Sequence, residues 1–307
     1  MDGIAKPVLK WVGGKTQILD EVLGLFPKDM ANYHEPFLGG GSVLLAFLAS
    51  VEAGHTALYG TVYASDLNPN LIALYKNVQS RPDEFIQETK ALIDAYSKCT
   101  GSTVNRKPMT MAEATTSPES YYYWIRAQFN ARKGAERLTP AASAMMVFLN
   151  KTCFRGVYRE NSSGGFNVPY GNYKNPCVME EAHIREVSRL IQPVVFTCCG
   201  FAAALAAVGD DDFVYLDPPY APENETSFVS YTADGFGLDA HKELFLLCAN
   251  MGAQMLMSNA DVPLVTKAFP SPAYTTKKIS CRRAIHSKEP DSRTTEVLIR
   301  KEAHTVS

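Results

Sequence analysis

The spacings that mark metal sites and disulfide frameworks are missing from this sequence. Its seven cysteines form an odd set without a CxxC pair, and its six histidines include no HExxH motif. Cysteines of this kind are typical of reduced thiols in a reducing compartment. We therefore predict that the cysteines have structural or incidental roles and that the protein needs no metal.

Long apolar runs and a strong excess of one charge are missing too. No run of about 18 apolar residues is present, and no signal-peptide pattern begins the sequence. With 30 basic and 32 acidic residues the net charge is −2, so a polyanion would have to bind at local basic patches. These features predict a cytoplasmic protein without a membrane span, or one that acts in a nucleus or a viral host compartment.

Two familiar nucleotide-binding motifs are incomplete. Gly14-Lys15-Thr16 suggests a P-loop, but that motif needs a glycine at position 9, which is Leu. The glycines at 39–41 do not form a GxGxxG motif, so a dinucleotide is not indicated. Trp11 and Lys15 flank a Gly-Gly pair, and they can still present an indole face and an ammonium group to a ligand.

The chain does contain an alternation of short strands and helices. A strand at 33–37 leads through the glycines into an apolar helix at 43–48, and a second strand at 62–65 ends at Asp66. Glycines at such a turn let a ligand approach the backbone and the free N–H groups of the next helix. Asp66, about 25 positions later, stands where nucleoside-binding units place a carboxylate for the ribose hydroxyls. Alternatively, Asp66 caps the helix that follows it.

The alternation stops near residue 80 and resumes after residue 193. Further strands are predicted at 194–197, 213–216, 254–258, 274–280 and 296–300, and helices at 201–208, 239–251 and 262–269. This pattern predicts the α/β class, with a doubly wound, mostly parallel, seven-stranded Rossmann-like sheet and an inserted, mainly helical module. Residues 221–237 are predicted to form a flap, and a second basic loop contains Arg282, Arg283, Lys288 and Arg293.

The tetrapeptide Asp217-Pro218-Pro219-Tyr220 follows the predicted strand at 213–216. Its prolines cannot extend a sheet, so a carboxylate, a carbonyl and an aromatic face lie at the carboxyl end of that strand. An amide-type or aromatic NH2 group is a poor nucleophile because its lone pair is delocalised. A site that alkylates such a group should accept both hydrogens, as Asp217 and the Pro218 carbonyl can, and should stack its ring, as Tyr220 can. A plain Asp-Pro turn is the alternative.

Residues 151–176 combine basic side chains with aromatic ones. Lys151, Arg155, Arg159 and Lys174 stand against one acidic residue, Glu160, and five aromatic residues are interleaved with them. This composition suits a β-hairpin that touches phosphates and places side chains in a groove of nucleic acid. A solvated loop is the alternative. The link at 97–119 has no predicted role.

Together these motifs resemble the Dam-like DNA adenine-N6 methyltransferases, in which the cofactor segment comes first, the target-recognition module second and the DPPY motif last. The resemblance spans roughly residues 8–300, and it is carried by Lys10–Lys15, Glu35–Ser42, Asp66–Asn68, Leu149–Lys151, Gly165–Gly171 and Asp217–Pro222. It implies a catalytic domain formed by residues 1–80 and 194–307, and a DNA target-recognition domain at 81–193.

The resemblance also implies ligands and individual roles. S-adenosylmethionine is the expected methyl donor, and the expected acceptor is an adenine flipped out of double-stranded DNA, because a stacked and paired N6 cannot reach a methyl donor. The positions of the family's cofactor site are Trp11, Lys15, Phe37, Gly39, Asp66 and Asp217. Those of its catalytic motif are Asp217, Pro218 and Tyr220. The residues expected to contact DNA are Asn150, Lys151, Arg155 and Arg159.

The chain departs from the family pattern at one place in the basic segment. Members that methylate GATC commonly carry Phe or Tyr, then Asn and Gly, where this chain has Phe154-Arg155-Gly156. Because Arg can pair bidentately with guanine, the change predicts another four-base palindrome that contains adenine, with CATG favoured over GATC.

The wider setting is also an expectation from the resemblance. We expect a monomer that belongs to a restriction-modification system with a separate companion endonuclease. One alternative is an amino-methyltransferase that acts on RNA bases or on protein glutamine. Another is a DNA-binding protein that has kept the fold and lost catalysis.

Overall fold

The computed structural model describes residues 5–222, 236–282 and 293–302. The chain divides into two compact units. The helical unit contains the described residues of Met1–Gly14 together with Gly39–Leu45 and Asn68–Gln192, and the sheet unit contains Lys15–Leu38, Ala46–Leu67 and the described residues of Pro193–Ser307. Most of the predicted flap and most of the predicted second basic loop lie outside the described residues.

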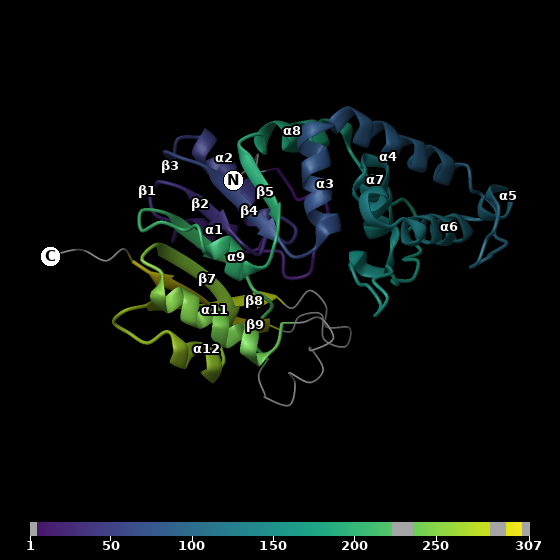
Figure 1. Ribbon diagram of the computed structural model, residues 1–307. Coiled ribbons are helices and arrows are strands. Elements are labelled where there is room, and N and C mark those ends of the chain that lie inside the picture. The colour runs from purple at the N-terminus through teal and green to yellow at the C-terminus, as the bar shows by residue number, and fades with distance from the viewer. Residues whose placement is uncertain (1–4, 223–235, 283–292, 303–307) are drawn as a thin grey trace. The chain divides into compact units, whose positions relative to one another are not determined.

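The sheet unit is built on seven strands, as predicted (Figure 1). Their order is β5 (Val194–Cys198), β4 (Val62–Asp66), β2 (Tyr33–Glu35), β6 (Phe213–Leu216), β7 (Gln254–Ala260), β9 (Arg293–Lys301) and β8 (Thr275–Arg282). The first five run parallel, whereas β9 pairs antiparallel with both β7 and β8. The predicted α/β class and the mostly parallel sheet are confirmed.

Alternation of side chains along β6 creates an apolar layer on each face of the sheet. Val214 and Leu216 belong to a core that includes residues of α9 (Phe201–Leu205), α11 (Leu238–Asn250) and α12 (Pro263–Ala268). Phe213 and Tyr215 point to the opposite face, where both rings meet the ring of Phe26. All four residues of the strand are buried, which explains its unbroken apolar sequence. Packing on both faces of the sheet therefore fixes the position of the carboxyl end of β6.

Shorter elements complete the sheet unit. Helix α1 (Leu19–Leu23) precedes β1 (Asp29–Met30), which pairs in parallel with β3 (Ala57–Leu58) as a separate two-stranded sheet. Helix α2 (Ser42–Glu52) begins in the helical unit and ends in the sheet unit. The helix predicted at 201–208 is shorter than expected, because α9 ends at Leu205.

Three helices of the helical unit begin with the same local signal. Asn68, Ser117 and Thr139 each precede a proline at the first helical position, and each side chain accepts a hydrogen bond from a backbone N–H of the first turn. Because Asn68 caps α3, the alternative role of Asp66 as that cap is wrong. The elements of this unit are α3 (Pro69–Ser80), α4 (Pro82–Ser97), α5 (Met111–Ala114), α6 (Pro118–Ala131), η1 (Gly134–Leu138), α7 (Pro140–Thr152), η2 (Phe154–Gly156) and α8 (Glu181–Leu190).

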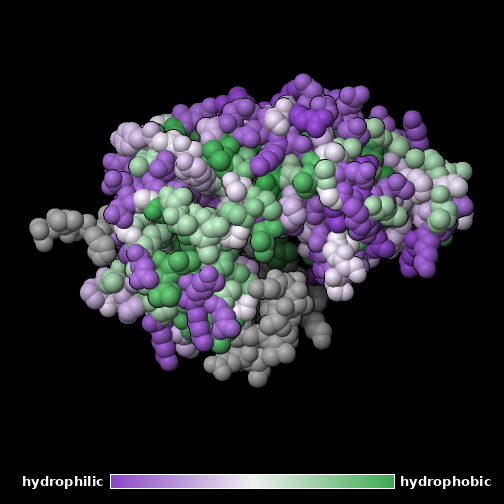
Figure 2. Space-filling model, in the orientation of Figure 1, coloured by the Kyte–Doolittle hydropathy of each residue, from purple (hydrophilic) through white to green (hydrophobic). Residues whose placement is uncertain are grey.

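The outer surface of α4 and α8 is mostly hydrophilic in the view of Figure 2. Lys90 of α4 pairs with Glu181 of α8, and Arg185 of α8 pairs with the same carboxylate. These exposed side chains alternate in sign, so this surface is a solvated face rather than a basic patch. No helix among the described residues is long and apolar enough to cross a membrane.

The helical unit does not begin at the predicted domain boundary of 80/81. Helix α3 packs with the inserted helices, since Asn77 Nδ2 donates to Ser143 Oγ and to the Leu138 carbonyl, both at 2.9 Å. Gln79 Nε2 donates to the Ile191 carbonyl at 2.7 Å. The alternation of strands and helices in the sequence places α3 in the catalytic domain. In the structure, however, the polar side chains of α3 form hydrogen bonds with the inserted module. That residues 81–193 recognise DNA remains a prediction.

Residues 151–176, which we call the recognition segment, do not form the predicted β-hairpin. Two isolated antiparallel bridges, Cys153–Tyr170 and Glu160–Phe166, join its arms, and neither extends into a strand. Gly156 and Gly164 have φ values of +67° and +71°, which interrupts regular pairing. The prediction of a hairpin was therefore right about the antiparallel course of the arms and wrong about regular strands.

Candidate active site

Asp217 follows β6, and an ammonium group lies directly on its carboxylate. Lys15 Nζ is 2.8 Å from Asp217 Oδ2, with the two side chains only 4% and 20% exposed. Burial raises the pKa of Asp217, and the charge and hydrogen bond of Lys15 oppose that rise. The structure thus brings together two residues predicted for the cofactor site.

Two further carboxyl groups lie within electrostatic range of Asp217. Glu35, at the end of β2, is buried and accepts a hydrogen bond of 2.6 Å from the Tyr33 hydroxyl. Burial raises the pKa of Glu35 to about 8; the Tyr33 bond opposes this shift and the charge of Asp217 adds to it. The charge of Glu296, on β9, also raises the pKa of Asp217. Asp217 therefore lies near a second charged carboxylate as well as beside Lys15, and the charges of Asp217 and Glu296 favour a cationic ligand.

Tyr220 is fixed at both its hydroxyl and its ring. The hydroxyl donates a 2.7 Å hydrogen bond to Glu296 Oε2. Burial raises the pKa of Tyr220 well above its usual value, so the hydroxyl stays protonated and can donate. Lys15 Nζ lies 5.0 Å from the centroid of the ring, within the range of a cation–π contact. The ring is thereby held in one orientation beside Asp217.

Two buried polar side chains hold the Pro-Pro turn. Asn259, at the carboxyl end of β7, accepts a 3.1 Å hydrogen bond from the backbone N–H of Ala221. The Nε2 atom of His241, from α11, lies 3.1 Å from the Pro219 carbonyl oxygen. Because each partner comes from a different element, the turn is anchored on the sheet and on the helix that covers it.

Trp11 packs against the predicted cofactor turn within the helical unit. A Cβ atom added to Gly40 would lie 2.8 Å from the Trp11 Cβ, and one added to Gly39 would lie 3.1 Å from the indole Cδ1. Gly39 also has a φ of +49°. Close contact with the indole, together with the backbone conformation of Gly39, explains why these positions are glycines.

The carboxyl ends of the neighbouring strands carry aromatic rings and Asp66. Phe37 stacks on Phe201 with ring centroids 5.7 Å apart, and Phe236 meets both rings edge-on. Asp66 ends β4 in register with Cys198 of β5. Of these residues, Phe201 was missed by the sequence analysis, although an aromatic residue directly after a strand and a glycine is a usable signal.

A small cavity lies beside Glu35 in the sheet unit. It has a volume of about 160 Å³, and its lining includes Ser65, Thr197 and Cys199 at strand ends and alanines of the α9 region. A site for a whole drug-sized ligand has about 300 Å³ or more. The cavity can therefore receive only part of a nucleoside cofactor.

The basic side chains predicted to contact DNA lie along the recognition segment. Arg155 is exposed and has a φ of +58°, and the neighbouring ring of Phe154 is 50% exposed. Arg159 is exposed, and its Nε donates to Asn167 Oδ1 at 2.7 Å. Burial lowers the pKa of Lys151, and the charge of Lys10 lowers it further. DNA contact by Lys151, Arg155 and Arg159 remains a prediction.

Asn150 does not fit its predicted role as a DNA contact. The residue is fully buried, and its Oδ1 accepts from the Lys10 backbone N–H at 2.8 Å. Its Nδ2 donates to the carbonyls of Lys10 and Gly156, both at 2.9 Å. Because both polar groups of the amide are used internally, Asn150 ties the N-terminal segment to the recognition segment instead.

A comparison with known families matches these features. The family model described as D12 class N6 adenine-specific DNA methyltransferase matches residues 11–285. The chain belongs to this family. It is therefore an adenine-specific DNA methyltransferase, and DNA is its substrate.

Relatives match nearly the whole methyltransferase. It is 35% identical over 297 residues to the Type II methyltransferase M.MjaIII of Methanocaldococcus jannaschii, covering 92% of this chain and 93% of that relative. It is 31% identical over 294 residues to a DNA adenine methylase of Haemophilus influenzae, covering 94% and 90%. Among solved structures, the rRNA methyltransferase aviRa from Streptomyces viridochromogenes matches with a TM-score of 0.34 and 14% identity over 98% of this chain and 90% of that chain.

Besides Phe201, three residues of the candidate site were not found from sequence. Asn259, His241 and Glu296 hold the turn at 217–220, which is the predicted catalytic motif. A polar residue at the carboxyl end of a strand could have indicated Asn259, whereas nothing near His241 or Glu296 distinguishes them. Within the described residues, no group of three His, Cys, Asp or Glu side chains could hold a metal ion.

Replacing Glu35 with Gln should remove a pH dependence of stability. The folded protein holds a proton on Glu35 up to a pH of about 8, whereas the unfolded chain releases it near 4.5. Stability is therefore full below about 4.5 and falls as pH rises to about 8, by about 1.4 kcal/mol per pH unit for one group. We expect urea unfolding of Glu35→Gln to show a flatter profile across this window. An unchanged slope of the free energy of unfolding against pH would contradict the conclusion that Glu35 is protonated in the folded protein.

Proposed function

We propose that this methyltransferase takes its methyl group from S-adenosylmethionine and transfers it to N6 of an adenine flipped out of a short palindromic duplex site. The observation that supports this most directly is the Lys15–Asp217 pair beside a Tyr220 ring held at its hydroxyl. When bound, S-adenosylmethionine supplies an electrophilic methyl group on a sulfonium centre. The family match favours adenine in DNA over RNA bases and protein glutamine, and it disfavours a protein without catalysis.

The residues of the chain fit a cationic nucleoside cofactor. In the sheet unit, we assign Asp66, at the end of β4, to the ribose hydroxyls, and the stacked rings of Phe37 and Phe201 to the adenine ring. The carboxylates of Asp217 and Glu296 carry the negative charge that attracts a sulfonium. In the helical unit, Trp11 and Gly39 form the remaining predicted contact surface.

The acceptor base would be bound by the catalytic turn. Asp217 and the Pro218 carbonyl accept the two N6 hydrogens and so localise the lone pair on the nitrogen. Tyr220 stacks on the base, and its bond to Glu296 fixes the ring before the base arrives. Formation of the N6–CH3 bond would break the bond from that carbon to sulfur and leave a neutral thioether, and N6 would lose one proton, which we assign to the Asp217 carboxylate. No covalent enzyme intermediate is needed.

Duplex DNA would be bound by the recognition segment. Lys151, Arg155 and Arg159 are the proposed contacts, and exposed Phe154 is placed next to Arg155. An arginine that pairs with guanine O6 and N7 contributes about 1–3 kcal/mol of discrimination. On this ground we propose a palindrome other than GATC, with CATG favoured.

Replacing Arg155 with Asn should change the site preference without cost to the fold. Arg155 occupies the left-handed region of φ and ψ, which Asn tolerates better than Arg. We therefore expect the free energy of unfolding to stay the same or to rise by about 0.5–1 kcal/mol. The ratio of methylation rates on CATG and GATC duplexes should change by about tenfold. The control is Arg185→Asn on exposed α8, and an unchanged ratio in Arg155→Asn would contradict this role.

Labelled methyl transfer tests the proposed function as a whole. The protein is incubated with tritiated S-adenosylmethionine and, separately, with duplex DNA, RNA and a protein mixture. We expect label only in the duplex and only on adenine N6, and mapping of the modified base gives the recognition site. Label in RNA or protein without label in DNA would overturn the proposal.

The biological setting is a further part of the proposal. Two relatives, M.MjaIII and the Type II methyltransferase M1.LlaDCHI of Lactococcus lactis subsp. cremoris, are named as Type II methyltransferases. On this basis we propose that the enzyme belongs to a restriction-modification system, with a companion endonuclease that acts separately. We propose a monomer on another ground, that one recognition segment and a second basic loop can straddle a single site.

A further inference from the structure

One indole separates the cofactor turn from the recognition segment. Trp11 packs on the backbone of Gly39 and Gly40, as described above, and its ring also stacks on Tyr158 with centroids 5.4 Å apart and planes inclined by 23°. Tyr158 lies in the middle of the recognition segment, close in sequence to Arg155 and Arg159. A residue predicted to bind cofactor and a segment predicted to bind DNA therefore share one aromatic contact.

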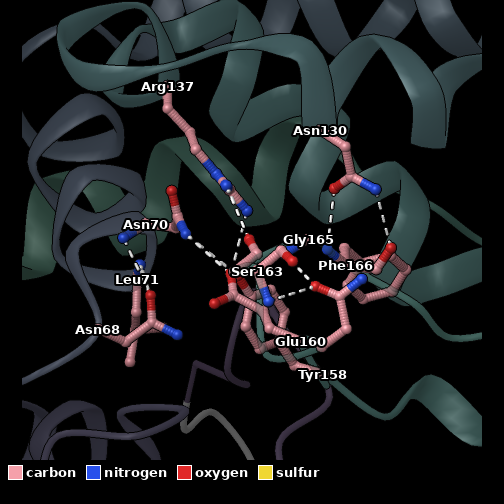
Figure 3. A network of polar contacts seen from close by, with 12 residues as sticks. Asn68, Asn70, Leu71, Asn130, Arg137, Tyr158, Glu160, Ser163, Gly165 and Phe166 are labelled. Atoms are coloured by element: carbon pink, nitrogen blue, oxygen red, sulfur yellow. Dashed lines mark hydrogen bonds and ion pairs between the residues drawn. The ribbon is translucent and has the colours of Figure 1, made fainter.

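Tyr158 is held by a polar network that leaves its ring little freedom (Figure 3). Its hydroxyl donates to Glu160 Oε1 at 2.5 Å and accepts from Asn70 Nδ2 at 3.1 Å. Arg137 pairs with the same Glu160 oxygen at 3.0 Å and donates to the Gly164 carbonyl at 2.9 Å. Because burial raises the pKa of Tyr158, the hydroxyl remains a donor at neutral pH.

Asn70 anchors this network on the helix that follows the predicted ribose-binding residue. It lies in the first turn of α3, is 7% exposed, and donates its own backbone N–H to the capping Asn68 side chain. In sequence, Asn68 is two residues after Asp66. The recognition segment is thus fastened to the start of α3 as well as to Trp11.

Asn150 makes a second connection between the same two segments. As described above, its amide bonds to both backbone groups of Lys10, which precedes Trp11, and to the carbonyl of Gly156, two residues before Tyr158. A movement of Trp11 must therefore move the recognition segment or break buried hydrogen bonds. Fully buried polar networks of this kind resist partial rearrangement.

We propose that Tyr158 is a positioning residue that couples cofactor binding to DNA binding through its stack on Trp11. The inference rests on the proposed function, since it takes Trp11 as a cofactor contact and the recognition segment as a DNA contact. A cofactor that shifts the indole also shifts Tyr158 and the segment that carries Arg155 and Arg159. By linkage, DNA that holds the segment in the shifted position strengthens cofactor binding by the same factor.

The coupling factor is the measurement that tests this role. The affinity of the full chain for a short duplex carrying both CATG and GATC is measured with and without saturating S-adenosylhomocysteine. We expect the wild type to bind the duplex about fivefold or more tightly with S-adenosylhomocysteine. In Tyr158→Leu, which loses the ring, the factor should fall close to one. Tyr158→Phe keeps the ring but loses the bonds to Glu160 and Asn70, and its factor should lie between these values.

Tryptophan fluorescence reports the stack independently of activity. The chain has two tryptophans, so a Trp124→Phe background leaves Trp11 as the reporter. We expect duplex DNA to change the emission of Trp11 in that background and to have no such effect when Tyr158→Leu is added. The control is Tyr59→Leu, a tyrosine that is 78% exposed in the sheet unit, which should leave both the coupling factor and the Trp11 emission unchanged.

Several outcomes would overturn the inference. A coupling factor near one in the wild type would do so, as would a wild-type factor in both Tyr158 variants. If Tyr158→Leu does not fold, the test rests on Tyr158→Phe. A coupling factor in Tyr158→Phe equal to that of the wild type then overturns the inference. These results differ from a failure of the proposed function, in which the wild type places no label on adenine in DNA.

Discussion

The Asp217→Ala variant is expected to bind DNA, to bind the cofactor more weakly and to transfer no measurable methyl group. The substitution removes an acceptor for an N6 hydrogen and the group placed to take the released proton. Loss of one such group at a preorganised site lowers a rate by about 10²–10⁴-fold, and here two functions are lost together. Single-turnover transfer of tritiated methyl to a duplex substrate measures the effect.

Stability has to be separated from chemistry in this experiment. Alanine leaves the buried ammonium of Lys15 without its Asp217 partner, so we expect the free energy of unfolding to fall by about 1–3 kcal/mol. Asp217→Asn retains the shape and one acceptor oxygen, and it should remain inactive while folding normally. Asp20→Ala, at an exposed position of α1, is the control and should be fully active. Near-normal turnover by Asp217→Asn would remove Asp217 from the chemistry.

Lys15→Met should produce the second largest loss, with a characteristic pH dependence. Burial raises the pKa of Asp217 and Lys15 opposes that rise, so removal of the ammonium lets the pKa climb further. Asp217 must be ionised to take the proton that N6 releases, and a smaller fraction is ionised at neutral pH in the variant. We expect methyl transfer to fall by about 10²-fold at neutral pH and to recover partly as pH rises. A pH–rate profile measured under single-turnover conditions shows this.

The charge-conserving variant Lys15→Arg is the matched control for that profile. Arginine retains a cation near Asp217, so the acidic limb of the pH–rate profile should stay close to its wild-type position. This should hold even if the different shape of the arginine side chain lowers the rate of methyl transfer. A loss in Lys15→Met that is equal at every pH would show that Lys15 acts only through cofactor binding. The proposed electrostatic role of Lys15, which is to lower the pKa of Asp217, would then be wrong.

The sheet and the turn at the end of β6 could be predicted because their signals are local. Four apolar residues followed by Asp-Pro-Pro define the end of β6, and the glycines at 39–41 define the turn before α2. Each signal depends on neighbours within a few positions. The proline-led starts of α3, α6 and α7 are local in the same way, and the helical content of the insertion follows from them.

The supports of the site could not be predicted because they join distant parts of the chain. Glu296 reaches Tyr220 only because β9 lies beside β7, and the sequence does not indicate that order. Asn150 was assigned to DNA because it stands in a family motif, yet its amide is used up on Lys10 and Gly156. Burial of a polar group and its partners is a tertiary property, and no local pattern reveals it.

The position of β9 has a consequence for how the enzyme is made. Within the described sheet, β8 pairs only with β9, and β9 alone connects it to β7. While the ribosome is still translating, β8 emerges with no neighbour to join, and the Tyr220 hydroxyl has no Glu296 to bind. The ring of Tyr220 therefore acquires its fixed orientation only after β9 has been synthesised and inserted between two strands that precede it.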